Sequence, residues 1–227
     1  MRGQEPLRRE EVAGLLREVD GAVLAGSAHA ERVAFWINAY NALVVDGYLC
    51  ARRASFRVGR LRFFDRIAWR VNGAVFTADD IEHGVLRGNR PGLLCATAPF
   101  SADDSRRAYA IVPMDPRIHF AISCGARSCP PVRIYDAARL DAQLDAATRA
   151  FVNHEVTLEG DALVLSEIFH WFQADFDPVP GGLRGFVARY LDDGPVRRAL
   201  LENDARRMVY RPYDWRLDLR DPWIAQA

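Results

Sequence analysis

The chain has 227 residues, half of them hydrophobic, and its 30 acidic and 30 basic residues cancel to a formal net charge of zero. This length and apolar content predict one large folded domain rather than a disordered chain. The balanced charge lacks the basic footprint of a general nucleic-acid binder, so we expect no nucleic-acid partner. All 30 cations are Arg. A chain without Lys cannot form a lysine Schiff base or the lysine-dependent phosphate loop, and we assign it no cofactor.

The hydropathy pattern predicts no membrane span, because no stretch approaches the roughly 20 apolar residues that a bilayer requires. The opening segment Met1 to Glu11 is too charged for a signal peptide. As it stands, the chain is expected to be cytoplasmic. If an N-terminal leader has been removed, we expect an exported protein instead. Its four cysteines fit either compartment.

Two helices are predicted near the N-terminus, an amphipathic one over Glu10–Leu24 and a more fully apolar one from Ala30 to about Arg52. The second should be central and buried. Asn38 and Asn41 interrupt it three residues apart on one face, where buried amides must find partners. They either brace a loop or line a site, Asn38 by orienting an imidazole and Asn41 by binding a substrate carbonyl.

A shorter predicted helix carries a candidate proton-transfer group. Thr77 should cap this helix, which continues to about Arg87. His83 points away from its apolar face, with Asp79 one turn earlier and Glu82 beside it. We expect these carboxylates to raise the pKa of His83 enough for proton transfer near neutral pH.

The remaining elements follow from turn residues and apolar spacing, and they indicate a single α+β domain, helical with short antiparallel hairpins around the central buried helix. Asn72-Gly73 is typical of a tight hairpin turn. The predicted elements are hairpins at Ile67–Val71 with Ala74–Phe76 and Val156–Leu158 with Leu163–Leu165, helices capped by Asp136 and Ser166, helices over Leu183–Leu191 and Val196–Asn203, and an edge strand over Met208–Arg211.

The most reactive side chains gather in the stretch Asp115–Pro131. Ile118–Ile122 reads as a short buried strand, and the following Gly, Arg, Ser and Pro residues force an irregular loop that holds Cys124 and Cys129. Strand ends often present functional groups because the strand fixes their position. Three interpretations remain open: both thiols are simply buried, they form a disulfide, or one is a functional thiol activated near His119 and Arg127.

Four segments together resemble the domain-of-unknown-function 547 family, which occurs in bacterial proteins and in plant proteins that carry a leucine zipper. They are Ala34–Ala42, Asp80–Arg87, His119–Pro130 with its Cys-Gly-Ala-x-Ser-Cys-Pro motif, and Tyr213–Leu217. The resemblance implies a domain over residues 32–218, preceded by an N-terminal helix in 1–31 and followed by a tail in 219–227. It implies no reaction, but it selects the polar positions Asn38, Asn41, Glu82, His83, Arg87, His119, Cys124 and Cys129.

The leading hypothesis is a thiol-dependent hydrolase or acyl-transferase acting on a small molecule or peptide, whose core could resemble that of cysteine hydrolases or transglutaminases. Cys124 or Cys129 would attack a carbonyl, and His83 or His119 would accept the thiol proton. Asn38 or Glu82 would orient the imidazole, and backbone N–H groups around Gly125 would hold the oxyanion. Asn41, Arg87 and Arg127 are assigned to substrate binding. The alternatives are a His/Cys zinc site and a non-catalytic binding or scaffolding module.

Overall fold

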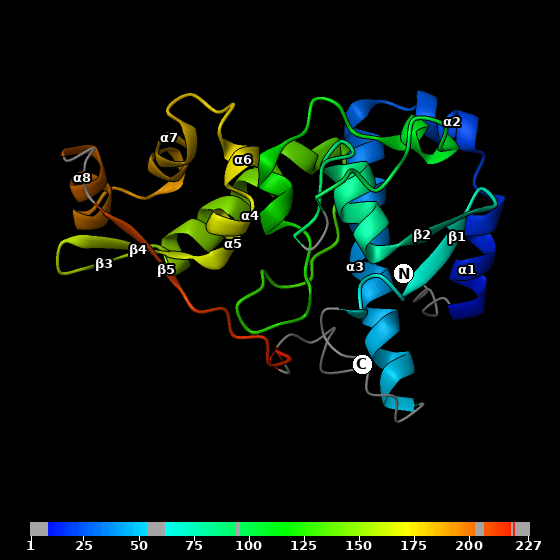
Figure 1. Ribbon diagram of the computed structural model, residues 1–227, viewed down its shortest axis with the longest axis horizontal. Coiled ribbons are helices and arrows are strands. Elements are labelled where there is room, and N and C mark those ends of the chain that lie inside the picture. Colours follow the sequence, from blue (N-terminus) through cyan, green and yellow to red (C-terminus); the bar gives the residue numbers. More distant parts are fainter. Residues whose placement is uncertain (1–8, 54–61, 94–95, 203–206, 219, 221–227) are drawn as a thin grey trace, which may run out of the picture.

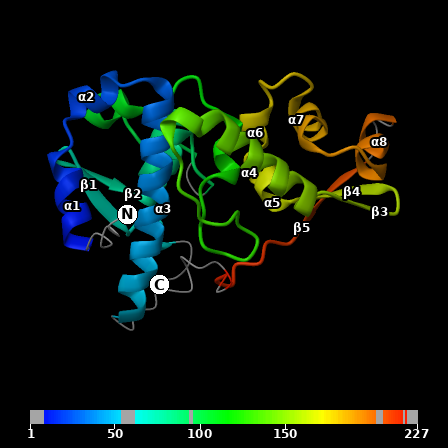
Figure 2. The same cartoon turned by 180° about the vertical axis from the view of Figure 1, so that it is seen from behind.

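The computed structural model describes residues 9–53, 62–93, 96–202, 207–218 and 220. The fold is α+β, as predicted, with helices predominating over two small sheets. Figures 1 and 2 show helices α1, α2 and α3 with hairpin β1–β2 at one end of the long axis, and helices α7 and α8 with the second sheet at the other. The chain's candidate functional segments lie between these two ends.

Three helices open the described chain: α1 (Arg9–Glu18), α2 (Gly21–Gly26) and α3 (His29–Arg53). The long central helix is confirmed. The single helix predicted over Glu10–Leu24 was wrong, because the chain breaks at Asp20. The Asp20 side chain accepts the N–H groups of Ala22 and Val23, at 2.8 and 3.1 Å, and so begins a new helix.

The first predicted hairpin is confirmed as β1 (Ala68–Val71) and β2 (Ala74–Thr77), which pair antiparallel. Asn72 and Gly73 form the turn, with φ angles of +47° and +76°. These left-handed conformations are the reason for the Asn-Gly pair, since Asn tolerates them and Gly carries no Cβ.

The second half of the chain forms a mostly helical unit around a three-stranded sheet of order β3-β4-β5. Strands β3 and β4 are the second predicted hairpin, and β5 pairs parallel with β4 as the predicted edge strand. The elements are α4 (Leu140–Glu155), β3 (Thr157–Glu159), β4 (Ala162–Ser166), α5 (Glu167–Trp171), α6 (Gln173–Phe176), α7 (Gly182–Tyr190), α8 (Pro195–Glu202) and β5 (Met208–Arg211).

In the described segments, four short 3₁₀ or π helices connect the larger elements: η2 (Asp80–Leu86), η3 (Ser105–Tyr109), η4 (Pro116–Phe120) and η5 (Ala137–Arg139). The strand predicted over Ile118–Ile122 was therefore wrong, because the segment begins in a helical turn. Asp115 accepts the N–H of Arg117 at 2.9 Å, and Pro116 stands at the first helical position, where its missing N–H costs nothing.

Buried apolar side chains form two clusters. One surrounds α3, where Trp36 and Ile37 are fully buried, and includes hairpin β1–β2 and helix η2. The other joins Phe169 and Phe176 to residues of α4, α7 and β4. Burial of these side chains supplies the main stabilisation of each cluster.

Candidate functional site

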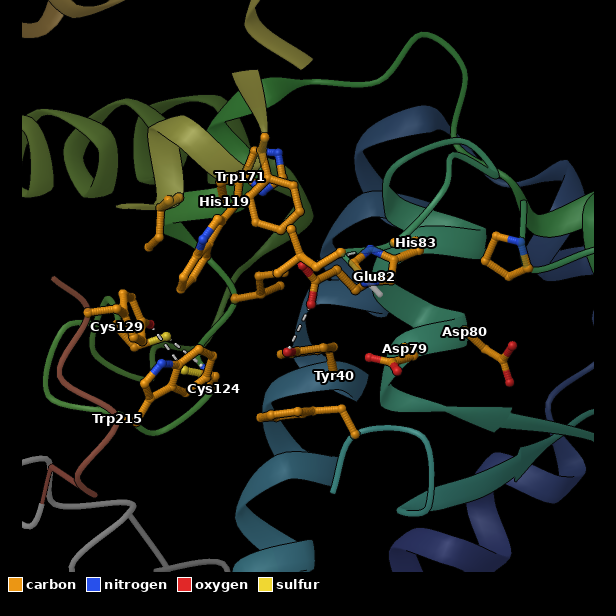
Figure 3. A pocket seen from close by; sticks show the side chains of 18 of the residues that line it. Tyr40, Asp79, Asp80, Glu82, His83, His119, Cys124, Cys129, Trp171 and Trp215 are labelled. Carbon is orange, nitrogen blue, oxygen red and sulfur yellow. Dashed lines mark hydrogen bonds and ion pairs between the residues drawn. The ribbon is translucent and has the colours of Figure 1, made fainter. Parts of the chain in front are cut away.

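A pocket of about 480 Å³ is lined by members of both apolar clusters. Figure 3 shows Tyr40 of α3 and Glu82 of η2 facing Cys124 and Cys129, with His119 above them. Aromatic side chains from helix α5 and the C-terminal segment complete the wall. The pocket therefore unites residues that are 175 positions apart in sequence, from Tyr40 to Trp215.

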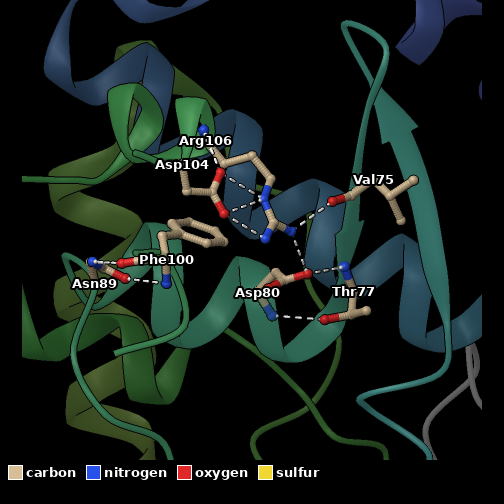
Figure 4. A network of polar contacts seen from close by, with 7 residues as sticks. All are labelled: Val75, Thr77, Asp80, Asn89, Phe100, Asp104 and Arg106. Carbon is tan, nitrogen blue, oxygen red and sulfur yellow. Dashed lines mark hydrogen bonds and ion pairs between the residues drawn. The ribbon is translucent and has the colours of Figure 1, made fainter. Parts of the chain in front are cut away.

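Helix η2 enters the pocket at a fixed angle because its first turn is capped from both sides. The Thr77 hydroxyl accepts the Asp80 N–H and the Asp80 carboxylate accepts the Thr77 N–H, each at 3.0 Å. This reciprocal pair is a capping box, and it confirms the predicted role of Thr77. Arg106 adds an ion pair to Asp80 at 2.9 Å and donates to the Val75 carbonyl, as Figure 4 shows.

His83 lies on η2 with only 8% of its surface exposed. Arg87 Nη1 donates to His83 Nδ1 at 3.1 Å, so the proton of the neutral ring is on Nε2. Burial and the Arg87 charge lower the pKa of His83 to about 4, and the expectation of a raised pKa was wrong. The sequence placed His83 on an exposed face, whereas the structure buries it beside a guanidinium.

Glu82 is a part-buried carboxyl of the site. Its Oε2 accepts the hydroxyl of Tyr40 at 3.1 Å. Burial raises the pKa of Glu82, although the charges of His119 and Arg87 oppose the rise. A carboxyl held in this way can act as a general acid or base closer to neutral pH than an exposed Glu.

His119 is held by Asp175, a residue that the sequence did not assign to the site. His119 Nε2 donates to Asp175 Oδ2 at 2.9 Å, and both side chains are essentially unexposed, at 1% and 0%. The ring stacks on Phe172 with 4.1 Å between centroids. Burial lowers the pKa of His119 despite the hydrogen bond to Asp175. The neutral ring therefore keeps a free lone pair on Nδ1, which has no hydrogen-bond partner among the described residues.

Asp175 stays ionised because two guanidiniums share it. Arg87 donates from Nε and Nη2 at 2.6 and 3.2 Å, and Arg90 from Nη1 at 2.7 Å. Although burial acts to raise it, hydrogen bonds from His119 and Arg87 hold the pKa of Asp175 well below its usual range. Arg87 was predicted to bind substrate. It instead donates hydrogen bonds to His83 and to Asp175, the partner of His119, and it does not line the pocket.

The cysteine loop is shaped by the C-terminal segment. Gly125 adopts a φ of +77°, a conformation that favours Gly at this position between Cys124 and Ala126. Its carbonyl accepts the Asp218 N–H at 2.9 Å, and the Arg127 N–H donates to the Arg216 carbonyl at 2.8 Å. These backbone pairs bring Tyr213 and Trp215 to the pocket. Arg127 is exposed and does not line the pocket.

The two thiols are free and have different environments. The Cys124 N–H donates to Cys129 Sγ at 2.8 Å, and Cys124 Sγ lies 3.2 Å from the hydroxyl of Tyr213. The hydrogen bond with Cys129, together with burial, raises the pKa of Cys124 well above its ordinary value. Burial also acts on Cys129, but hydrogen bonds from Cys124 and Tyr213 outweigh it and lower the pKa of Cys129. Cys129 is therefore the more acidic thiol of the pair.

Asn38 and Asn41 brace the cysteine loop and the segment after it. Asn38 exchanges two hydrogen bonds with the backbone of Tyr135, at 2.8 and 2.9 Å. Asn41 donates to the Ala121 carbonyl at 3.0 Å and accepts the Ser123 N–H at 2.9 Å. Neither amide lines the pocket, so of the two interpretations left open the structure shows the bracing one.

The backbone donors near Gly125 are already engaged. The Gly125 N–H donates to Ser123 Oγ at 3.2 Å, while those of Cys124 and Arg127 have the partners given above. The expected oxyanion site in this loop is therefore not available in this conformation. Tyr40 and Tyr213 line the pocket, and their hydroxyls are O–H donors of the kind that can bind an oxyanion in place of backbone N–H groups.

Two further expectations concern metals and membranes. Across the described ranges, no three or more His, Cys, Asp and Glu side chains are grouped so that they could hold a metal ion. His119, Cys124 and Cys129 line the same pocket without forming such a set. None of the described helices is both long enough and apolar enough to span a bilayer.

Asp79 yields a prediction about stability. Burial raises the pKa of Asp79 to about 6, with Glu82 adding to the rise and His83 opposing it. The folded state thus binds this proton more tightly than the unfolded state, and stability falls as pH rises between about 4 and 6. We expect Asp79→Asn to raise the free energy of unfolding by about 1 kcal/mol at pH 7.5, after allowance for solvent screening, and by nothing near pH 4.

Urea unfolding at the two pH values checks this expectation. The control is Asp103→Asn, an exposed carboxylate, for which we expect a change below about 0.5 kcal/mol at both. A variant that is less stable than the parent at pH 7.5 would show that the Asp79 carboxylate has a stabilising partner in solution.

Comparison with known proteins places the chain in a family. The family model described as "Protein of unknown function, DUF547" matches residues 24–152, more than half of the chain. The chain belongs to the DUF547 family. No curated protein and no solved structure matches it.

The DUF547 match contains only part of the site. His83, His119, Cys124 and Cys129 lie inside residues 24–152, whereas Asp175 and the aromatic wall of α5 and the C-terminal segment lie outside. One sequence signal could have found Asp175: it interrupts the apolar run of Phe169, Phe172 and Phe176. A carboxylate on a buried aromatic face must have charged partners.

Proposed function

We propose that this DUF547 domain is a thiol-dependent hydrolase or acyl-transferase with Cys129 as its nucleophile. The observation that supports this most directly is the position of Cys129 Sγ, which accepts the Cys124 N–H at 2.8 Å inside a pocket shared with two neutral imidazoles. A hydrogen bond to a sulfur stabilises its thiolate, and the thiolate is the nucleophilic form.

The chemistry has two steps. The Cys129 thiolate attacks a carbonyl carbon, and the C–S bond forms as the bond from that carbon to the leaving group breaks; the leaving group takes the proton that His119 accepted from the thiol. Water or an acceptor nucleophile then attacks the thioester carbonyl and gives its proton to His119, and the C–S bond breaks to release the acid or the acylated acceptor and restore the thiolate. The pocket's volume of about 480 Å³ and its largely apolar walls suit an acyl compound of small size.

His119 is the base in this proposal, and Asp175 is its positioning residue. Asp175 accepts the Nε2 proton of His119 and leaves Nδ1 as the basic nitrogen, the arrangement that a third residue provides in triads. In the described part of the chain no hydrogen bond joins a cysteine sulfur to an imidazole. Proton transfer between Cys129 and His119 therefore passes through a bound water or the substrate.

The test is the pH dependence of iodoacetamide labelling at each cysteine, measured by peptide mass spectrometry. We expect Cys129 to react at least about tenfold faster than Cys50 at pH 7, because Cys50 lies outside the pocket and lacks these hydrogen bonds. Tyr213→Phe removes a hydroxyl that lowers the pKa of Cys129 and should slow its labelling about threefold to tenfold.

The matched control is Tyr210→Phe, whose ring lies outside the pocket and stacks on His170. This variant should leave the Cys129 rate unchanged. A second measurement is turnover of activated esters and thioesters, which Cys129→Ser should reduce at least about 100-fold. Labelling of Cys129 at or below the Cys50 rate, with equal ester turnover in the variant, would mean that the thiols only brace the loop of a non-catalytic binding domain.

A further inference from the structure

The charged side chains that line the pocket, among the described residues, are all acidic. Three carboxylates line it, those of Asp79, Asp80 and Glu82, and among the described residues that line it there is no Arg. The chain has 30 Arg and no Lys, so a wall without cations is unusual for this molecule. The two imidazoles do not restore the balance, because burial keeps both neutral. An electronegative pocket attracts cations and disfavours anions.

Two of the three carboxylates already have partners, and one does not. Asp80 pairs with Arg106, and Glu82 accepts the Tyr40 hydroxyl. The Asp79 side chain makes no hydrogen bond and no ion pair within the described ranges. It is part-buried at the pocket surface, facing the space that a ligand would enter. A half-desolvated carboxylate without a donor gains most from a ligand that brings one.

A second polar group in the wall lacks a partner. His119 Nδ1 is buried and unpaired, and because Nε2 holds the proton for Asp175, Nδ1 can only accept. Buried acceptors are normally paired with protein or water. No donor among the described residues satisfies Nδ1, and this observation is independent of the carboxylates.

The opposite wall is aromatic. Trp171, Tyr213 and Trp215 form a ring cluster with centroids 4.6 to 5.6 Å apart. Figure 3 shows Trp215 and the thiols on one side of Tyr40 and Asp79 on the other. Burial raises the pKa of Tyr40, and the charges of Glu82, both cysteines and Asp79 add to the rise. The carboxylates and the thiols therefore belong to one site.

We infer that the substrate is an amine or guanidine with an apolar body, whose cation binds Asp79 and whose body lies on the Trp171, Tyr213 and Trp215 cluster. This inference rests on the proposed thiol chemistry and names its substrate class. The bound cation also offsets the negative charge that appears when Cys129 ionises, a role that no protein cation performs among the described lining residues. Anionic acyl compounds are correspondingly rejected.

Three probes that share a 2-phenylethyl group test the inference: phenethylamine, 2-phenylethanol and 3-phenylpropanoate. Trp171 and Trp215 report binding through tryptophan fluorescence in the full chain. We expect the amine to bind at least about tenfold more tightly than the alcohol, and the carboxylate to bind most weakly. Asp79→Asn should bring the amine and alcohol within about twofold of one another, while Asp103→Asn should leave the preference intact.

Any of four results would overturn the inference. The parent protein could bind amine and alcohol equally, bind the carboxylate more tightly than the amine, or give no saturable response to the amine. The fourth result is an amine preference that survives Asp79→Asn. Failure of the thiol chemistry is recognised separately. Cys129→Ser should keep the amine preference, because the cation binds the carboxylate and not the sulfur. If the protein prefers amines but Cys129 is unreactive, the proposed thiol chemistry is refuted and the assignment of a cationic ligand is retained.

Discussion

Replacing Asp175 with Asn is expected to lower the free energy of unfolding by about 3–5 kcal/mol, because it removes the anion from a buried pair and leaves the Arg87 charge uncompensated. The Asp175 side chain is fully buried and that of Arg87 is 7% exposed. Asn keeps the shape and can still accept one hydrogen bond, so the loss is mainly electrostatic. Urea unfolding at pH 7 measures it.

The pH dependence of this loss has a defined sign. Because the pKa of Asp175 is depressed in the folded state, its stabilisation is fully present above the unfolded value of about 4 and is lost as pH falls through the folded value. The difference between the parent and the Asn variant should be constant from about pH 5 to pH 8 and should narrow only below about pH 4.

Asp177→Asn is the control for this prediction. Asp177 is exposed and only two residues away, and its replacement should change stability by less than about 0.5 kcal/mol. A loss below about 1 kcal/mol for Asp175→Asn would indicate that water reaches Arg87 and solvates it in the variant.

The second large effect is expected for Asn41→Ala, which should cost about 2–4 kcal/mol. The Asn41 side chain accepts a hydrogen bond from the Ser123 N–H at 2.9 Å and donates to the carbonyls of Ala121 and Arg133 at 3.0 and 3.3 Å. The residue is 3% exposed, so most of these backbone groups would be left without water to replace the amide. Without these hydrogen bonds the cysteine loop should loosen, and the rate at which iodoacetamide labels Cys129 should change.

Asn153→Ala provides a matched comparison. Asn153 likewise makes three backbone hydrogen bonds, to Arg149, Tyr190 and Asp192, but it is only part-buried. Water can satisfy its partners, and we expect a loss of about 1 kcal/mol. Equal losses for the two variants would show that the number of hydrogen bonds, and not their burial, sets the stability.

Local patterns predicted several elements that a few neighbouring residues decide. The Asn72-Gly73 turn, the Thr77 cap and the long apolar helix through Asn41 were all confirmed. The failures were also local. Asp20 breaks one predicted helix by capping another, and Asp115 with Pro116 replaces a predicted strand by a helical turn. In both cases an Asp side chain bound nearby N–H groups and outweighed the apolar spacing.

The ionisation of the site depends on residues that no spacing connects. The sequence identified His83 and His119 as candidate site residues. The low pKa of His83, however, follows from its burial beside Arg87. The tautomer of His119 follows from Asp175, which is 56 residues away. Likewise, Tyr213 reaches Cys124 only because the C-terminal segment pairs with the cysteine loop.

The sequence by itself determined the α+β class, the DUF547 membership and the short list of reactive side chains, because these depend on composition, periodicity and contiguous motifs. Only the tertiary structure decided which of them meet in one pocket, which are braces and which thiol is the more acidic. Desolvation and charge pairing act through space over a few ångströms, and the neighbours that impose them come from distant parts of the chain.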